Sequence, residues 1–331
     1  MIDTLKYSSS PDETYEQRRD KEVKTLRMGL MRYVLKTPLA KYIDVEFSEP
    51  ISAEVSTDRW NNWVFRASIS GYINGQSSLK YFNTYGGISA SKVTEDWKID
   101  IDLDYSYGKD IFKTEDLTLE SITTSMSAEA LVVKSLSDHW SIGGNASVLS
   151  SSYSNYDLKI SFMPGIEFNI FPYSESTRRQ FRFLYKIGYM YNDYIDTTIY
   201  NKTREALFSH SLSGAFEVIQ KWGSIDFSVL WSNYLQDFSQ NRLSLSTSLS
   251  WRVVKGLSIN IGGSYSFIHN QISLVKGGAT SEEILLRRKE LETNYRYFMH
   301  FGFSYTFGSI YNNVVNPRFG GGGGGQMVII H

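Results

Sequence analysis

A strict two-residue alternation near the middle of the chain constrains its fold more than any other feature. Between residues 97 and 107 every odd position is apolar or aromatic, and the even positions begin with Lys98, Asp100, Asp102 and Asp104. Because successive side chains of a β-strand point to opposite faces, this segment would have one apolar face and one charged face. It therefore predicts a long strand that separates two unlike environments.

Similar alternation covers most of the chain from Trp60 onward. It is clear at residues 140–148, 156–170, 181–191, 243–251, 257–267 and 295–307, and weaker at 63–73, 81–93, 122–132, 208–218 and 225–231. The pattern predicts about twelve strands. Each is long enough for the roughly 9–11 residues that cross a bilayer, whereas strands of soluble sandwiches usually have roughly 5–6 residues. We therefore predict an all-β membrane protein: a transmembrane β-barrel of about twelve antiparallel strands with a short N-terminal α/β periplasmic segment.

The composition narrows the range of functions. A mean hydropathy of −0.29 is compatible with a membrane barrel, because lipid-facing and lumen-facing residues alternate and their average looks soluble. A formal net charge of −1 argues against a nucleic-acid partner, and the absence of cysteine excludes disulfides, thiolate zinc sites and cysteine nucleophiles. No apolar run reaches the roughly 18 residues of a transmembrane helix. We expect neither a cofactor nor a metal ion.

Three regions divide the chain. Residues 1–58 predict a partial periplasmic α/β segment, with a helix at about 12–36 and a strand at about 41–48. Residues 59–307 form the predicted barrel, and residues 308–331 form a Gly-rich periplasmic tail. The start lacks a basic segment followed by an apolar one, so we expect a signal peptide to have been removed or truncated.

The connections and the tryptophans give the predicted barrel two different ends. Short connections at 94–95, 135–138, 172–177, 220–221 and 254–256 alternate with longer ones at 108–116, 192–204 and 269–293. Short periplasmic turns and longer external loops would produce this alternation. Most of the tryptophans lie near the short turns, as an interfacial aromatic belt would require. They are Trp60, Trp63, Trp97, Trp140, Trp222 and Trp251.

The strand face opposite the apolar one carries the candidate lumen residues. They are Arg66, Lys98, Asp100, Asp102, Asp104, Glu129, Arg182, Lys186, Arg252, Arg296 and His300. The three aspartates could form a lining that attracts cations, or a weak metal site. Alternatively, they form ion pairs with basic residues on the inward faces of other strands. Alternate residues of a strand lie roughly 6–7 Å apart, too far for one ion to bind all three directly. We therefore favour ion pairs and predict no metal site.

A hydrolytic barrel would need a histidine beside a serine and an orienting acid. His210 shares its parity with apolar neighbours and would face lipid, away from Ser209 and Ser211, whereas His300 has inward parity. No local spacing supplies the acid, so we expect no enzymatic activity. Residues 281–292 combine leucines and charges at helical spacing, which predicts a short helix in the longest loop, as a lid, plug, partner contact or solvated segment.

The last predicted strand resembles a known targeting signal. Its alternating aromatics are Tyr295, Tyr297, Phe301, Phe303, Tyr305 and Phe307. The pattern is similar to the C-terminal signal of bacterial outer-membrane proteins, which the barrel-assembly machinery reads, although Phe307 is not terminal here. Residues 18–40, 60–65 and 89–98 also resemble uncharacterised outer-membrane β-barrel proteins of Bacteroidota and related Gram-negative phyla. This resemblance implies an outer-membrane location, contact with lipid, insertion by that machinery, and no catalytic residues.

These patterns lead to one functional expectation and two alternatives. We expect a structural anchor or subunit of an envelope assembly, with periplasmic or outer-membrane protein partners bound through residues 1–58 and the tail. A narrow, porin-like passive channel for small solutes is the first alternative, and a lipid- or peptide-hydrolysing barrel is a minor one. A continuous water path through the lumen would favour the channel, and a plug of inward Arg–Asp pairs would favour the anchor.

Overall fold

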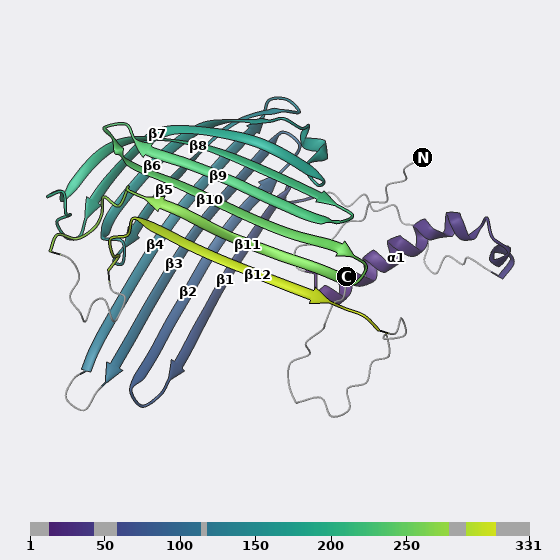
Figure 1. Ribbon diagram of the computed structural model, residues 1–331, viewed down its shortest axis with the longest axis horizontal. Helices are drawn as coiled ribbons and strands as arrows, with labels where there is room; N and C mark the ends of the chain where they lie inside the picture. Colours follow the sequence, from purple (N-terminus) through teal and green to yellow (C-terminus); the bar gives the residue numbers. More distant parts are fainter. Residues whose placement is uncertain (1–12, 43–57, 114–117, 278–288, 309–331) are drawn as a thin grey trace.

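The computed structural model of the protein describes residues 13–42, 58–113, 118–277 and 289–308 (Figure 1). Helix α1 spans Tyr15–Val34 and is followed by the 3-10 helix η1 at Pro38–Tyr42. The Thr14 hydroxyl accepts a hydrogen bond from the Gln17 N–H, and the Gln17 side chain accepts one from the Thr14 N–H at 2.9 Å, which caps the helix at its start.

Of the strand predicted at 41–48, only Lys41 and Tyr42 lie in the described part of the chain. Lys41 and Tyr42 lie in η1, because Pro38 has the fixed φ of a first helical residue and begins a tight helical turn there. Residues 43–48 lie outside the described part of the chain, as does most of the helix predicted at 281–292 and nearly all of the tail. No helix among the described residues is both long and apolar enough to cross a membrane.

The rest of the described chain is one antiparallel sheet (Figure 1). Its strands are β1 (Trp63–Gly75), β2 (Leu79–Val93), β3 (Trp97–Lys113), β4 (Thr118–Ser135), β5 (Trp140–Ser151), β6 (Tyr156–Asn169), β7 (Arg179–Tyr194), β8 (Arg204–Gln220), β9 (Gly223–Tyr234), β10 (Asp237–Val254), β11 (Leu257–Ile268) and β12 (Tyr295–Tyr305). Each strand pairs with its neighbours in sequence. The predicted class, an all-β chain of twelve antiparallel strands with an N-terminal helix, is confirmed.

The sheet is strongly curved and therefore has an outer and an inner face (Figure 1). Apolar side chains on the outer face remain exposed, with Ile69 at 82% and Phe301 at 85%. The inner face is rich in serine, and hydroxyl pairs such as Ser147 and Ser161, at 2.7 Å, join neighbouring strands there. An apolar outside around a polar inside is the arrangement of a membrane barrel and the reverse of a soluble sandwich.

β1 and β12 are the two edges of the sheet. The ladders of the described residues run from β1 to β12 without joining these two strands to each other. Both strands are exposed along almost their whole length. Within a bilayer such unpaired backbone groups are too costly to persist.

The two ends of the sheet differ in their connections. The turn end, where β1 begins and β12 ends, has residues 94–96, 136–139, 170–178, 221–222 and 255–256 between strands. The loop end has residues 76–78, 114–117, 152–155, 195–203, 235–236 and 269–294. The predicted alternation of short and long connections is therefore only partly correct. The loop predicted at 108–116 is mostly strand, because β3 continues to pair with β4 as far as Lys113.

The buried apolar side chains of the described residues all lie toward the loop end. They are Tyr156, Tyr194, Leu207, Tyr234, Ile268, Ile272 and Leu274. The turn end instead has a short 3-10 helix, η2 (Tyr173–Glu175), within the connection 170–178. The buried apolar packing of the described residues is therefore confined to the loop end, where polar residues such as Asn192 and Thr198 are buried beside it.

Candidate functional site in the sheet interior

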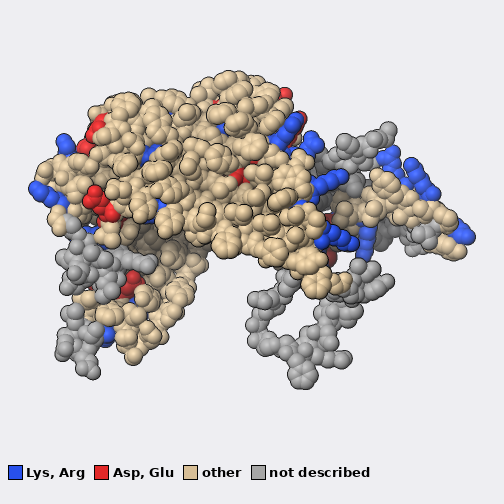
Figure 2. All heavy atoms as spheres, in the orientation of Figure 1, with Lys and Arg blue, Asp and Glu red and all other residues tan. Residues whose placement is uncertain are grey.

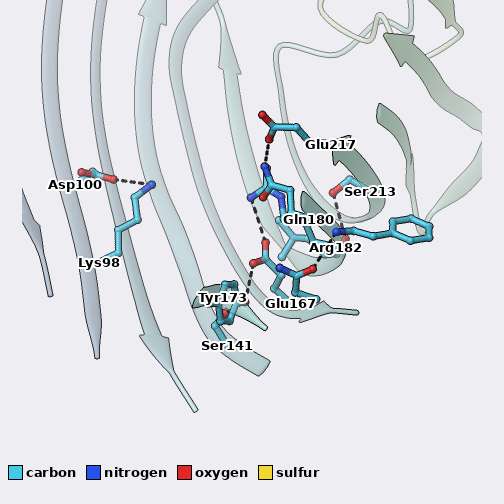
Figure 3. Close-up of polar contacts among 12 residues, drawn as sticks. Lys98, Asp100, Ser141, Glu167, Tyr173, Gln180, Arg182, Ser213 and Glu217 are labelled. Carbon is cyan, nitrogen blue, oxygen red and sulfur yellow. Dashed lines mark hydrogen bonds and ion pairs between the residues drawn. The ribbon is translucent and has the colours of Figure 1, made fainter. Parts of the chain in front are cut away.

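A group of polar side chains lies on the inner face at the turn end (Figure 3). The Tyr173 hydroxyl donates to Glu167 on β6 at 2.9 Å and bonds the Ser141 hydroxyl on β5 at 2.6 Å. An Arg182 guanidinium nitrogen on β7 lies 3.8 Å from the same glutamate. Partial burial raises the pKa of Tyr173, so its hydroxyl stays protonated and remains a donor well above neutral pH.

The connection that carries Tyr173 is fixed to the strands on both sides. The Tyr173 N–H donates to the Asp138 carbonyl at 2.9 Å. Asn169 is fully buried, and its side-chain oxygen accepts the N–H groups of Phe171 and Phe181 at 3.3 and 3.0 Å. On the next ladder the Gln180 amide donates to Glu217 (Figure 3). These bonds hold Tyr173 over the inner face.

A hollow of about 360 Å³ lies in the inner wall beside this group, and we refer to it as the interior hollow. Lys98, Glu129, Asn145, Glu167, Arg182 and Lys186 are among its lining residues. Lys98 pairs with Asp100 of its own strand at 3.5 Å (Figure 3), and the Asn145 amide lies 3.5 Å from Glu129. The fold thus places four of the predicted lumen residues around one space.

The remaining predicted lumen residues lie elsewhere on the inner face. In the ladders Arg66 is opposite Ser89, Asp102 is opposite both Ser89 and Glu129, Arg252 is opposite Ser258, Arg296 is opposite Ser266 and His300 is opposite Gly262. Asp104 lines a separate hollow of about 180 Å³ near β1 and β2. The interior hollow is therefore a local feature of the wall and not a ring of charge around it.

The expected ion pairs between the β3 aspartates and basic residues of other strands are not formed among the described residues. Asp100 pairs with Lys98 of its own strand, and Arg182 pairs with Glu167. Arg66 is separated from Asp102 by the whole of β2, a distance of roughly 10 Å between strand axes. Within the described ranges no three His, Asp or Glu side chains are grouped so that they could hold a metal ion.

His210 lies on the outer face, among aromatic rings. Its Nδ1 is 3.2 Å from the Tyr185 hydroxyl, and its ring centroid is 5.0 Å from that of Trp231. The His300 ring lies beside Phe298 at 5.6 Å. In the described part of the chain neither histidine is hydrogen-bonded to a serine and a carboxylate, so this geometry contains no catalytic triad.

At the loop end two of the connections fold over the inner face of the sheet. Residues 195–203, which join β7 to β8, and residues 269–277, which follow β11, pair through a bridge between Thr198 and Val275. We refer to these two segments together as the loop plug. Thr198 is fully buried, and Ile272 is 6% exposed. Polar and apolar residues of these connections are thus withdrawn from solvent.

The loop plug packs against the inner wall. Ile272 forms a buried cluster with Leu207 of β8 and Tyr234 of β9, and Met190 of β7 packs against this cluster. Polar bonds add to the contact, since the Gln240 amide of β10 donates to the Tyr200 hydroxyl at 2.7 Å. The two loops therefore fold inward and cover the inner face of β7, β8 and β9 at this end.

Asn155, in the short connection between β5 and β6, ties both segments of the loop plug together. Its side-chain amide donates to the carbonyls of Asp196 and Ser273 at 2.9 and 2.8 Å, and its side-chain oxygen accepts the Asp196 N–H at 2.8 Å. The residue is 5% exposed and has a φ of +62°. Asparagine tolerates this left-handed conformation better than most residues, which allows the side chain to point at both loops.

The predicted interfacial aromatics lie at the turn end. Trp63, Trp97 and Trp140 begin β1, β3 and β5, Trp222 lies in the turn before β9, Trp251 lies close to the end of β10, and Trp60 precedes β1. On β12, Tyr295, Tyr297, Phe301, Phe303 and Tyr305 share one face and are exposed, as is Phe307 just beyond the strand. Figure 2 shows the largely uncharged surface that the sheet presents in this view.

Sequence reasoning overlooked Glu167, Tyr173, Asn145 and Asn155. Glu167 and Asn145 occupy inward positions of the same alternation that predicts the other lumen residues, so the alternation could have identified them. The role of Tyr173 depends on how a connection folds back over the sheet, and that of Asn155 depends on contacts with segments far along the chain. Strand periodicity carries no information about either.

Comparison with known proteins identifies the family. The family described as "Protein of unknown function, DUF481" matches residues 74–275, which include most of the strands. The chain belongs to this family. No curated protein matches the DUF481 chain. A solved structure of a NanC porin aligns with 72% of this chain and 98% of its own, at 11% identity and a TM-score of 0.35. The architecture described above rests on the strand ladders of the DUF481 chain itself.

Proposed function

We propose that the protein is a β-barrel of the bacterial outer membrane, closed by pairing of β1 with β12. The exposed apolar outer face and the aromatics at the turn end support this location, because lipid covers the first and the membrane interface accommodates the second. Closure of the two edges satisfies the backbone groups that the hydrocarbon would otherwise leave unpaired. An even number of strands makes the closing pair antiparallel.

Within that location, we propose that the barrel serves as an anchor or subunit of an envelope assembly and not as an open pore or an enzyme. The loop plug is the observation that carries this conclusion, since it packs against the inner face and is held by hydrogen bonds from the connection 152–155 and from β10. Partners would bind through the segment that contains α1. Leu26, Leu30 and Tyr33 of that helix are 61%, 56% and 63% exposed, so an apolar stripe is available to a protein partner.

Fractionation of cells that produce the full-length protein tests the location. We expect the protein in the outer-membrane fraction, with faster gel migration before boiling than after it, because a closed barrel resists unfolding by detergent. Recovery in the soluble fraction, or migration unaffected by boiling, would contradict the proposed barrel.

A narrow channel that opens when the loop plug moves is the second candidate function. The serine-lined inner wall favours it, because small hydroxyl side chains leave a polar path beyond the plug. Liposome swelling in arabinose separates the two functions. The anchor predicts no swelling by the wild-type protein under any applied condition, whereas the channel predicts swelling once the plug is released.

A further inference from the structure

The interior hollow holds two charged groups that its own ion pairs do not neutralise. Lys98 pairs with Asp100, and Arg182 pairs with Glu167. Among the described residues the Lys186 ammonium group has no ion-pair partner, and Glu129 has only the 3.5 Å contact with Asn145. The hollow therefore carries one available cation on β7 and one available carboxylate on β4.

An unused hydrogen-bond acceptor lies between these two charges. The side-chain oxygen of Asn145, on β5, is buried and has no partner, although the nitrogen of the same amide approaches Glu129. A buried acceptor without a donor costs about 1–3 kcal/mol, which a ligand N–H would recover. The hollow thus offers a carboxylate, an acceptor and an ammonium group in the order of the strands.

The spacing and the remaining walls indicate the size of a ligand. β4 and β7 are three ladders apart, or roughly 14 Å around the wall, and Met190 is the β7 residue level with Glu129. Lys186 lies four residues, or roughly 13 Å, further along the strand, so the Cα atoms of the two charged residues are roughly 19 Å apart and their side chains shorten that distance. Leu131, Val133 and Leu184 supply apolar surface. A volume of about 360 Å³ lies within the range of small-ligand pockets.

Gly165 keeps the Lys186 side chain in position. A Cβ at residue 165 would lie 2.6 Å from Cγ of Lys186 and 2.7 Å from the Tyr185 carbonyl oxygen. The lysine stem therefore crosses β6 where that strand has no side chain. This close approach leads the ammonium group into the hollow.

We propose that the interior hollow binds short peptides in their zwitterionic form. The peptide carboxylate pairs with Lys186, its ammonium group pairs with Glu129, and a backbone N–H donates to the Asn145 oxygen. An extended tripeptide spans about 10–11 Å, which leaves the rest of the separation between Glu129 and Lys186 to the lengths of their side chains. The inference rests on the proposed function only in requiring a folded barrel whose interior admits solvent.

Calorimetric titration of the folded, detergent-solubilised full chain tests this inference with three matched peptides. Trialanine carries both charges, N-acetyl-trialanine lacks the ammonium group, and trialanine amide lacks the carboxylate. We expect trialanine to bind saturably with one site per chain, and each blocked peptide to bind at least about tenfold more weakly, because each loses one charge-assisted contact. Absence of saturable binding, or equal affinity for all three peptides, would overturn the proposal.

Two substitutions assign the ends of the peptide. Lys186→Met is expected to lower the affinity for trialanine to that for trialanine amide, without weakening the binding of the amide further. Glu129→Gln should do the same relative to N-acetyl-trialanine. Lys186→Arg should retain binding, and Lys80→Met, at an exposed lysine of β2 outside the hollow, should leave it unchanged. Variants that weaken all three peptides equally would contradict the assignment.

The titration is read separately from the function of the barrel. Heat-modifiable migration shows that each protein is folded, and the blocked peptides test the wild-type protein even if a substitution prevents folding. A wild-type protein that binds trialanine but conducts ions freely would refute the proposed obstruction by the loop plug and leave the peptide site intact. A folded protein that does not conduct ions and binds no peptide would refute the peptide site alone.

Discussion

Asn155 joins the two segments of the loop plug to each other and to the connection between β5 and β6. Its left-handed φ of +62° is common to a few asparagines of the chain, but its three side-chain hydrogen bonds reach two separate loops. Each such bond contributes about 0.5–1.5 kcal/mol when its partners are otherwise satisfied. A single small residue therefore links three connections that are distant in sequence.

Replacement of Asn155 by glycine should loosen the loop plug. Glycine adopts the same backbone conformation without strain, so the change removes the three hydrogen bonds and preserves the turn. If the second candidate function holds, we expect the variant to swell liposomes in arabinose at least several-fold faster than the wild type. Asn62→Gly, at a left-handed asparagine of the turn end, is the matched control. Equal swelling by both variants would contradict a channel whose plug is held by Asn155.

Tyr173 should titrate at a higher pH than an exposed tyrosine. Burial disfavours its phenolate, so the folded pKa is raised above its ordinary value of 10.0. The protonated Tyr173 hydroxyl thus stabilises the folded state below pH 10, and this contribution is lost as the pH rises through the raised folded pKa. The difference in ultraviolet absorbance between the wild type and Tyr173→Phe should show one tyrosine that ionises above pH 10. A difference curve centred at or below pH 10 would contradict the described burial.

At the scale of strands, side-chain periodicity predicts the positions of the strands better than it predicts the lengths of the connections. The alternation at residues 97–107 predicts β3 because a strand with one apolar face and one polar face leaves a regular trace in the sequence. The pattern does not predict the end of that strand, because Gly108 and Lys109 interrupt the alternation while backbone pairing continues to Lys113. The fold of connections 170–178 and 195–203 depends on buried asparagines and long-range contacts, which leave no periodic signal.

The edges β1 and β12 should pair in the assembled protein. The chain contains no cysteine, so any disulfide within it must join the two introduced cysteines. We expect Ser68→Cys on β1 to form a disulfide with one of Phe298→Cys, His300→Cys or Gly302→Cys, because all four positions lie on the inner face and near the middle of their strands. Ile69→Cys points outward and should not cross-link to the same partners. A folded, heat-modifiable protein that cross-links at none of these positions would refute closure by these strands.

At the scale of the whole molecule, the interior is divided into two unlike parts. The loop end is packed with apolar side chains around Ile272, whereas the turn end holds the charged residues of the interior hollow. The apolar outer face needs lipid, and the polar inner face needs water or a polar ligand. A barrel obstructed at the loop end and hydrated at the turn end satisfies both requirements, which is why we favour an anchor with an interior binding site over a pore.

Conductance of the purified wild-type protein in planar lipid bilayers tests the central claim most directly. We expect folded, heat-modifiable protein to insert without producing stable conductance steps, because the loop plug obstructs the interior. Stable, porin-like open steps from the unmodified protein at low voltage would contradict it.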